Sequence, residues 1–333
     1  MSVRLKDVAV RAGVSIRTVS NVVNDYPYVR AETRARVQAA IDELGYRPNL
    51  TARQLRRGRT GMIALAVPDL TIPYFGELAG HVLMAAERHG LTLLIEQTAG
   101  SREREVMLAQ GPRAKSIDGL LLSPLAADVE DLPTGSESVP LVLLGERIYD
   151  PRFDHVAIDN VAAAEAATRH LLESGRRRVA AVGVASSARS TMADLRLRGY
   201  RQAMDGYGLT VDERLVVRTT WFRRPDGYVA TKQLLESGEP PEAMFCFNDL
   251  IAHGALRALS EAGLRCPEDV AVIGIDDIEE NRYTVPSLTS IAPDKSKIAH
   301  HAVELLVRRI GGERPDGVDY TPGFSLSVRE SAP

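Results

Sequence analysis

From Gly61 onward, short apolar runs alternate with segments of helical periodicity, and this alternation constrains the fold more than any other feature. Most of the runs are continuously apolar, which is typical of parallel strands covered on both faces. Strands separated by helices indicate a doubly wound α/β fold, and nine strands fit two lobes better than one sheet. The expected strands lie at 62–67, 91–96, 119–123, 141–144, 156–158, 179–183, 215–218, 244–247 and 270–275.

Segments of helical spacing lie between these strands, at residues 75–89, 161–174, 195–207, 226–236, 250–262 and 296–309. In open parallel sheets, ligands bind outside the carboxyl ends of the strands. Polar pairs follow four of the expected strands, and they begin at Pro68, Glu146, Asn248 and Asp276. We therefore expect these strand ends to converge on one cleft.

Three short helices are indicated in the first 45 residues, and the first two form a helix-turn-helix arrangement. The first helix stops at Gly13, Ser15 is placed to cap a second helix over 15–24, and a third over 31–44 ends at Gly45. In this arrangement the second helix enters the DNA major groove. The inward residues are expected to be Leu5, Val8, Ala9 and Ala12, then Ile16 or Val19 with Val22 and Val23, then Val37, Ala40, Ile41 and Leu44.

The charge distribution points to the same segment. The whole chain has a net charge of -3, but residues 1–60 hold 12 Lys and Arg against 5 Asp and Glu, whereas the remainder holds 29 against 39. A basic module on an acidic body favours a nucleic-acid partner for the module, because phosphate neutralisation dominates such binding. A solvated basic face is the alternative.

Several classes of protein are disfavoured by the absence of their sequence signals. No run of about 20 apolar residues and no signal peptide is found, and Cys246 and Cys266 have no metal or disulfide spacing, so we expect a cytoplasmic location. No G-x-S-x-G, P-loop or G-x-G-x-x-G motif is present. The neighbours His300 and His301 point about 100° apart on a helix, which disfavours a shared metal. We expect no cofactor, no metal and no enzymatic activity.

Long motifs at both ends of the chain resemble the LacI–GalR family of bacterial regulators. The first motifs are LKDVAVRAGVSIRTVSNVVN and ELGYRPNLTARQLRRGRTGMIALAVPD, and the later ones are PPEAMFCFNDLIAHGALRALSEAGLRCPEDVAVIGIDD and PSLTSI. The resemblance covers essentially the whole chain in the same order. It implies a transcriptional regulator, expected to be a repressor, that binds a palindromic operator as a homodimer and responds to a small-molecule effector.

The resemblance also implies the domain organisation. A small all-α helix-turn-helix headpiece would occupy residues 1–48, and a hinge helix and linker would occupy 49–60. The effector domain would be a two-lobed α/β domain like a type I periplasmic binding protein. Its chain crosses between the lobes near residues 160, 290 and 321. The first lobe would comprise 61–160 with 291–320, and the second 161–290 with 321–333.

Residues at the start of the second helix are expected to read base edges in the major groove. By motif position, Arg17 would pair with a guanine, Ile16 would contact a thymine methyl, and Asn21 would read an adenine. Asn21 departs from the family, in which an arginine commonly follows the TVS run. The residues expected to contact phosphates are Lys6, Ser15, Thr18, Ser20, Asn24, Arg30 and Thr33. Capping or turn chemistry is the alternative for the Ser and Thr residues.

The segment from Asn49 to Arg56 would be the hinge helix. Isolated helices below about 12 residues are marginal in water, so this one should order only when paired with its dimer mate on DNA. By resemblance, Leu55 would enter the minor groove as an apolar wedge, with Arg56 among the arginines that contact phosphates beside it. An ordinary linker with one surface leucine is the alternative.

The effector residues implied by motif position are Tyr74, Phe75, Glu146, Arg196, Phe222, Asn248 and Asp276. Sugar-like ligands need an aromatic face and charged groups that bond to hydroxyls, and this set supplies both. Core packing is the alternative for the aromatic residues, and a helix N-cap or an interlobe salt bridge for Asp276. Whether Trp221 or Phe222 faces the ligand stays open.

The identity of the effector is less constrained. Ser190 and Met192 lack the polar pair of purine-responsive relatives, and residues 291–293 carry no glutamine, where some sugar regulators place one. The balance favours a carbohydrate. Whether it acts as inducer or corepressor stays open. A solute-binding protein of a transporter shares the two-lobed fold, but the basic first segment and the missing signal peptide disfavour it.

Overall fold

The computed structural model describes residues 3–23, 26–46, 59–133, 138–185, 191–313 and 316–333. The chain divides into two compact units, Met1–Thr60 and Gly61–Pro333. Each unit has a hydrophobic core of its own, as separate domains do. Most of the predicted hinge segment lies outside the described residues, which end at residue 46 and resume at residue 59.

The first unit contains α1 (Leu5–Ala12), α2 (Ile16–Val23) and α3 (Ala31–Leu44). Its core contains Val8, Val19 and Val37, which are fully buried. α1 ends at Gly13, whose φ of +65° is left-handed backbone that glycine adopts without strain. The predicted helix-turn-helix arrangement is confirmed. Val19 is the inward residue of α2, while Ile16 keeps 48% of its surface exposed.

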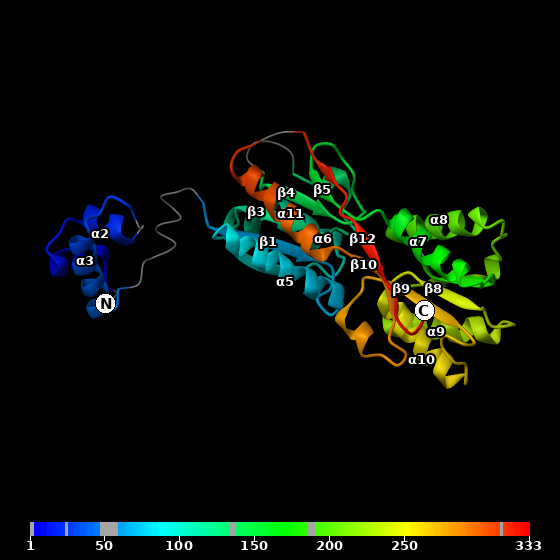
Figure 1. Ribbon diagram of the computed structural model, residues 1–333. Coiled ribbons are helices and arrows are strands. Elements are labelled where there is room, and N and C mark those ends of the chain that lie inside the picture. The colour runs from blue at the N-terminus through cyan, green and yellow to red at the C-terminus, as the bar shows by residue number, and fades with distance from the viewer. Residues whose placement is uncertain (1–2, 24–25, 47–58, 134–137, 186–190, 314–315) are drawn as a thin grey trace. The chain divides into compact units, whose positions relative to one another are not determined.

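Two six-stranded sheets form the second unit (Figure 1). The first contains β1 (Met62–Val67), β2 (Thr92–Gln97), β3 (Gly119–Leu122), β4 (Leu141–Leu144), β5 (Asp154–Val156) and β11 (Asp319–Tyr320). The second contains β6 (Val179–Ala185), β7 (Val216–Thr219), β8 (Ala243–Cys246), β9 (Ala271–Ile275), β10 (Thr289–Pro293) and β12 (Phe324–Ser327). Their strand orders are β11-β5-β4-β3-β1-β2 and β12-β10-β9-β8-β6-β7. Neighbouring strands are parallel except β10 and β12.

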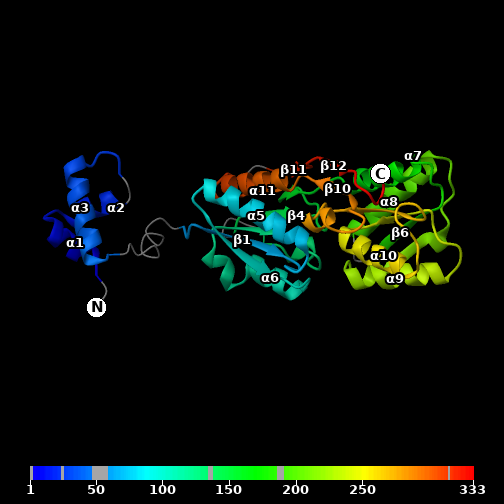
Figure 2. The same cartoon turned by 60° about the horizontal axis from the view of Figure 1, so that its bottom comes forward.

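Helices cover both faces of each sheet (Figure 2). The first sheet lies between α6 (Arg102–Gln110) on one face and α5 (Pro73–Arg88) with α11 (Lys295–Ile310) on the other. The second lies between the pair α7 (Asn160–Glu173) and α8 (Thr191–Gly206) and the pair α9 (Arg224–Glu236) and α10 (Asp249–Glu261). These layers explain the continuous apolar runs, because successive strand residues enter cores on opposite faces. Within the described part of the chain, no helix has the length and apolar character needed to span a membrane.

The chain passes between the two sheets three times. It leaves the first sheet after β5 and enters α7, returns from β10 to α11, and leaves again between β11 and β12. The second passage differs slightly from the expected boundary near residue 290. β10 stays in the second sheet through Pro293, because it pairs with β9 and β12 there, so residues 291–293 lie in that sheet.

Glycine allows the closest helix contacts of the second sheet. A Cβ on Gly254 of α10 would lie 2.1 Å from the carbonyl oxygen of Arg224, and one on Gly227 of α9 would lie 2.1 Å from that of Ile251. Backbone atoms cannot move aside as a flexible side chain can. The two helices therefore pack at a separation that admits no side chain at these positions.

We predict that Gly254→Ala destabilises the protein by about 1–3 kcal/mol, the usual cost of overpacking, despite the better helix propensity of alanine. Urea unfolding followed by circular dichroism would measure the change. Gly80→Ala is the matched control, because Gly80 lies on the exposed side of α5 with open space around its Cα. It should be neutral or stabilising, and a neutral Gly254→Ala would contradict the packing described.

Candidate DNA-binding surface and effector site

The second helix of the headpiece presents side chains outward while its apolar side joins the core. Arg17 is exposed, Ile16 is half exposed, and Asn21 is partly buried. A side chain must be accessible to reach base edges, and Arg17 and Ile16 meet this condition most fully. Of the residues expected to contact phosphates, Lys6 and Arg30 are exposed as well.

The hydroxyls of Ser15 and Thr18 have structural partners at the start of α2. Ser15 Oγ accepts a hydrogen bond of 3.1 Å from the Thr18 backbone N–H and lies 2.9 Å from Thr18 Oγ1. This is the capping geometry that satisfies a free backbone donor at a helix N-terminus. Phosphate contact by these two residues stays a prediction, as it does for Ser20 and Thr33.

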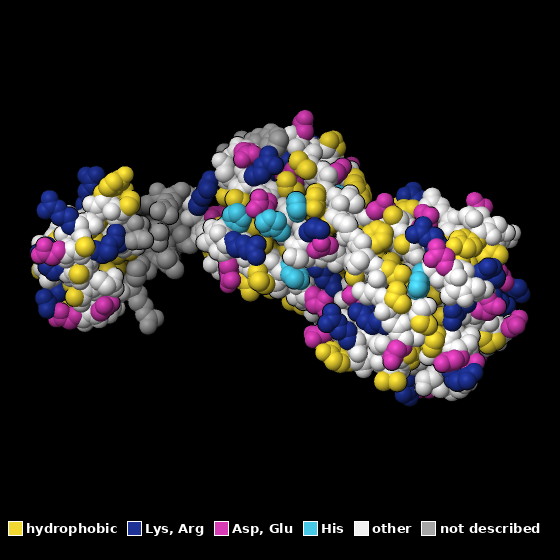
Figure 3. Space-filling view, in the orientation of Figure 1, with side chains coloured by type: hydrophobic (Ala, Val, Ile, Leu, Met, Phe, Trp, Pro, Cys, Tyr) yellow, Lys and Arg dark blue, Asp and Glu magenta, His cyan; other side chains and the backbone are white. Residues whose placement is uncertain are grey.

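Basic side chains are spread over the headpiece (Figure 3). Arg11 pairs with Glu43 at 2.6 Å, and both side chains are more than half exposed. An exposed ion pair of this kind contributes at most about 1 kcal/mol to the free energy of unfolding. Both charged groups are also in contact with solvent. Asn24, Asn49, Leu55 and Arg56 belong to the predicted DNA contacts but lie outside the described residues.

In the second unit, a chain of polar groups joins both lobes at the expected effector site. Glu146 follows β4 of the first sheet, and its Oε1 accepts a hydrogen bond of 2.5 Å from Asn160 Nδ2. Asn160 begins α7, and its Oδ1 accepts a 2.7 Å bond from Arg196 Nε on α8. Arg196 Nη1 donates to the carbonyl oxygen of Phe247. Asn160 and Arg196 are 1% and 5% exposed, so these partners satisfy groups that water does not reach freely.

Asp276 and Tyr74 lie beside this chain. Burial raises the pKa of the Asp276 carboxyl to about 6, with Arg196 and Lys295 acting in the opposite direction. Burial also raises the pKa of Tyr74, and the carboxylates of Asp276 and Glu146 add to this effect. Tyr74, Glu146, Arg196 and Asp276, which the sequence motifs selected from four separate segments, therefore act electrostatically on one another. A buried carboxyl with a displaced pKa is typical of a binding site.

The backbone at Asp276 is strained. Its φ is +122° and that of Asp277 is +44°, both in the region that side chains other than glycine rarely adopt. Asp277 is held by Ser327 Oγ at 2.9 Å and by Arg329 Nη1 at 2.7 Å. The strain is thus maintained by the segment that follows the last passage between the lobes.

Asn248 directly follows Phe247, whose carbonyl oxygen accepts from Arg196, and it connects this group to the segment of Trp221 and Phe222. Asn248 Oδ1 caps α10 by accepting from the Ile251 N–H at 2.9 Å, and its Nδ2 donates to the Phe222 carbonyl oxygen at 3.1 Å. Phe222 is half-buried against the core, whereas Trp221 is 63% exposed. Phe75 packs edge-on against Tyr74, with ring centroids 5.4 Å apart. Direct ligand contact by Phe75, Phe222 and Asn248 stays a prediction, as it does for Tyr74, Glu146, Arg196 and Asp276.

An ion pair connects the lobes at one edge of the site. Arg223 Nη2, at the start of α9, donates to Asp69 Oδ2 after β1 at 2.6 Å. The Thr71 hydroxyl, which bonds to the other carboxylate oxygen of Asp69, is the main cause of the lowered pKa of Asp69, and Arg223 adds to it. The Arg223 side chain is 56% exposed, so water screens its attraction to Asp69 and the ion pair holds the two lobes together only weakly.

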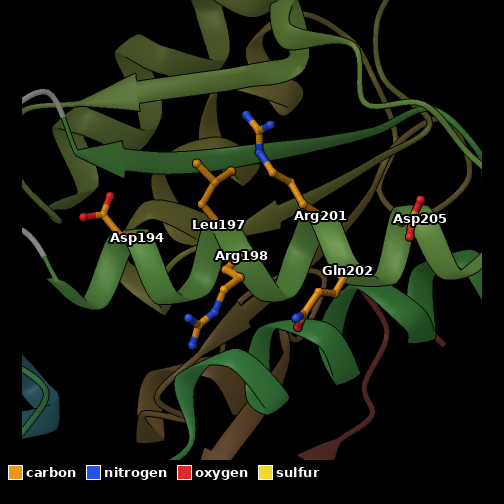
Figure 4. A pocket seen from close by; sticks show the side chains of 6 residues that line it. All are labelled: Asp194, Leu197, Arg198, Arg201, Gln202 and Asp205. Atoms are coloured by element: carbon orange, nitrogen blue, oxygen red, sulfur yellow. The ribbon is translucent and has the colours of Figure 1, made fainter.

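A hollow of about 450 Å³ lies elsewhere, along the outer side of α8 (Figure 4). Its lining residues are Asp194, Leu197, Arg198, Arg201, Gln202 and Asp205. They come from a single helix and include no aromatic side chain, and none of the predicted effector residues is among them. Small-molecule sites are usually enclosed and largely apolar, so this hollow is a poorer candidate than the site around Asp276.

Sequence motifs did not select three residues that complete the site. Asn160 joins Glu146 to Arg196, and its signal in the sequence is its position two residues after the expected strand at 156–158. Glu77 and Lys295 lie within 2.5 Å of each other beside Asp276, although 218 residues separate them. In the described ranges, no group of three or more His, Cys, Asp and Glu residues is arranged to hold a metal ion.

The fold and site define a class of protein: a helix-turn-helix DNA-binding unit joined to a two-lobed small-molecule-binding unit. Comparison with known families agrees. "Bacterial regulatory proteins, lacI family" matches residues 4–49, and "Periplasmic binding protein-like domain" matches residues 168–332. The match at 4–49 decides against a transport protein.

Individual relatives establish the family. The HTH-type transcriptional repressor PurR of Haemophilus influenzae (strain PittEE) is 34% identical over 98% of both chains. The structure of the transcriptional regulator CelR with cellobiose is 31% identical over 99% of both chains, with a TM-score of 0.71. The Lac repressor dimer bound to operator and anti-inducer is 27% identical over 100% of this chain and 99% of that one, with a TM-score of 0.85. The chain belongs to the lacI family and is a DNA-binding transcriptional repressor, not an enzyme.

We predict that Asp276→Asn stabilises the protein at pH 7.5. Burial raises the pKa of this carboxyl from 3.8 in the unfolded chain to about 6 in the folded protein. Its ionisation therefore destabilises the fold increasingly as the pH rises from about 4, and the full effect is present above pH 6. This pKa shift corresponds to an increase of up to about 3 kcal/mol in the free energy of unfolding of Asp276→Asn over the parent at pH 7.5.

Urea unfolding at several pH values would test this prediction. The difference between Asp276→Asn and the parent should shrink as the pH falls from 6 and disappear below about pH 4. Asp205→Asn on the exposed side of α8 is the control and should show no such difference. An Asp276→Asn variant no more stable than the parent at pH 7.5 would show that the carboxyl is not desolvated.

Proposed function

We propose that the chain binds a palindromic operator as a homodimer in the cytoplasm and that a neutral sugar controls this binding. The observation that carries the proposal is the presence, in one chain, of an outward-facing recognition helix and of a buried cluster of charged and polar side chains around Asp276. The DNA-binding unit would supply the sequence preference, and the cluster around Asp276 would bind the effector that controls it.

The recognition helix supports specific binding to DNA. Ile16 and Arg17 project from the first turn of α2, where side chains of a helix-turn-helix meet base edges. A bidentate arginine–guanine contact contributes about 1–3 kcal/mol of discrimination. A dimer with two-fold symmetry would place two such helices on two half-sites, and this requires a palindromic sequence.

Selection of bound fragments from random-sequence DNA, followed by gel-shift titration, would test the DNA proposal. We expect a palindromic consensus. Leu55→Ala should weaken binding to the consensus by more than tenfold, since the apolar wedge is lost, while binding to random DNA should change little. Equal losses on both DNAs would reject the wedge, and failure to select any sequence at moderate salt would reject the proposed function.

An uncovered apolar edge of the first sheet supports the homodimer. β2 is an edge strand, on which Leu94 and Ile95 are 37% and 46% exposed. On the adjoining helix α5, Leu83 and Met84 are 44% and 58% exposed. Exposed apolar edge strands tend to be covered by another chain. A second copy of this chain is the proposed occupant, since the Lac repressor structure that this fold resembles is a dimer on its operator.

We predict that the double variant Leu94→Lys with Ile95→Lys weakens the dimer. Burying two like charges at the contact should raise the dimer dissociation constant by more than tenfold and reduce operator affinity in parallel. Analytical ultracentrifugation would measure the first effect. Val229→Lys is the control, because Val229 is 49% exposed and lies on α9, which covers the second sheet. A double variant that remains as dimeric as the control would place the interface elsewhere.

The charged groups around Asp276 favour a neutral polyhydroxy ligand. Arg196 donates to Asn160 and to the Phe247 carbonyl, and Lys295 donates to Glu77 and to the Asp277 carbonyl. Among the described residues, no hydrogen bond reaches the Asp276 carboxylate, which is 9% exposed. Hydroxyl groups would satisfy this carboxylate, whereas a phosphate would meet repulsion from it and from Glu146.

Thermal-shift measurements on the full chain would identify the ligand class. Cellobiose and ribose, which occur in the structures of two family members, are the first probes. Each should be tested beside its phosphorylated form, and nucleobases form the second class because Tyr74 and Phe75 offer rings for stacking. A bound ligand raises the midpoint temperature of unfolding, because at a concentration one hundred times its dissociation constant it stabilises the folded protein by about 2.7 kcal/mol. A response to phosphorylated sugars alone would overturn the neutral-ligand proposal.

A ligand that binds two lobe arrangements unequally shifts the equilibrium between them by that difference, and operator affinity changes by the coupled amount. Operator titration with and without any sugar found in the screen would show whether it releases the repressor or strengthens its binding.

A further inference from the structure

The loop that carries Asp276 belongs to the second lobe, but side chains of the first lobe hold its backbone. Lys295, the first residue of α11, donates from Nζ to the Asp277 carbonyl oxygen at 3.0 Å. Glu77 on α5 accepts from the Glu279 N–H through Oε1 at 2.8 Å. The same two side chains bond to each other, with Lys295 Nζ 2.5 Å from Glu77 Oε2.

Burial increases the contribution of these hydrogen bonds to the free energy of unfolding. Only 9% of the Lys295 side chain and 29% of the Glu77 side chain are exposed. A charged hydrogen bond in such a setting is stronger than one on the surface, and leaving one partner unpaired carries the full desolvation penalty. The pair therefore has two tasks: each member neutralises the other, and each fixes one backbone group of the loop.

The position of the pair connects it to the effector site. Lys295 Nζ lies 5.8 Å from the centre of the Tyr74 ring, and Asp276 directly precedes the carbonyl that Lys295 holds. Lys295 also stands one residue after Asp294, which caps α11 at the second passage between the lobes. A movement of one lobe against the other would therefore either break these two hydrogen bonds or carry the loop along with the first lobe.

We infer that Glu77 and Lys295 are positioning residues that clamp the loop of Asp276 to the first lobe and so tie the effector site to the lobe arrangement. This inference rests on the proposed function, because it gives the clamp a part in the effector response. The clamp differs from a simple ion pair, since it needs a donor at position 295 and an acceptor at position 77.

Amide hydrogen exchange of the full chain, measured by mass spectrometry without DNA or effector, tests the clamp. Lys295→Met should speed exchange in peptides covering residues 276–283 by about tenfold or more, because a charged hydrogen bond to the loop is lost. Peptides of β8 should be unaffected. A merely structural role would instead speed exchange throughout the unit and lower the midpoint of urea unfolding.

A variant in which the two charged residues are swapped distinguishes the clamp from a simple ion pair. The double variant Glu77→Lys with Lys295→Glu keeps opposite charges in place, but lysine cannot accept from the Glu279 N–H and glutamate cannot donate to the Asp277 carbonyl. We expect exchange in 276–283 to remain as fast as in Lys295→Met. Recovery to the parent rate would overturn the clamp.

Two further variants complete the design. Lys297→Met on the same helix removes a 62% exposed lysine that pairs with Asp294, and it should leave the loop unchanged. If Lys295→Met fails to fold, Glu77→Gln keeps an acceptor for Glu279 and should speed exchange only slightly, whereas Glu77→Ala should match the expected tenfold change. Unchanged exchange in 276–283 in Lys295→Met or Glu77→Ala would reject the inference. Because no ligand or operator is used, this result is independent of the test of the proposed function.

Discussion

Buried charge at the carboxyl ends of the parallel strands is the constraint on which the effector unit depends. Asp249 is fully buried there, and burial raises the pKa of its carboxyl, while the bonds that this carboxyl accepts from Ser290, Asn281 and the Ile278 N–H act in the opposite direction. An unpaired charge in such a position would cost several kcal/mol. These three partners belong to the second lobe, whereas bonds such as those from Asn160 to Glu146 and from Arg223 to Asp69 connect polar groups of the two lobes. The ligand site that we propose lies beside Asp276, whose carboxyl is buried and has a raised pKa.

The apolar layers of the fold could be predicted from the sequence, whereas its polar connections could not. β1 and β4 were predicted to the residue, since a run buried on both faces is continuously apolar. α6 was not predicted, because its sequence REREVMLAQ has no apolar stripe and its buried residues include Glu105. That carboxylate accepts from the backbone N–H groups of residues 125–127, a role that no periodicity reveals. β10, β11 and β12 were missed because polar residues interrupt their apolar residues, as in TSIAP and FSLS.

The site shows the same division. Family motifs located Tyr74, Arg196 and Asp276, since each stands at a fixed place in a recognisable segment. They gave no information on Glu77 and Lys295, because pairing of this kind depends on the topology that brings α5 and α11 together on one face of a sheet. Side-chain partners far apart in sequence are selected by the fold, and a single sequence does not record which of them meet.

Asn160 stands where the chain passes from one lobe to the other, and its amide holds Glu146 of one lobe with one end and Arg196 of the other lobe with the other end. Substitutions at these three positions will therefore not have additive effects. A change of effector preference attempted at Glu146 alone would leave Asn160 Nδ2 with only its longer bond of 3.3 Å to the Ile158 carbonyl oxygen, and this cost would obscure any gain in new contacts. Altering the ligand of this repressor should require the three positions to be varied together, and scans of single substitutions would rank the most useful combinations as failures.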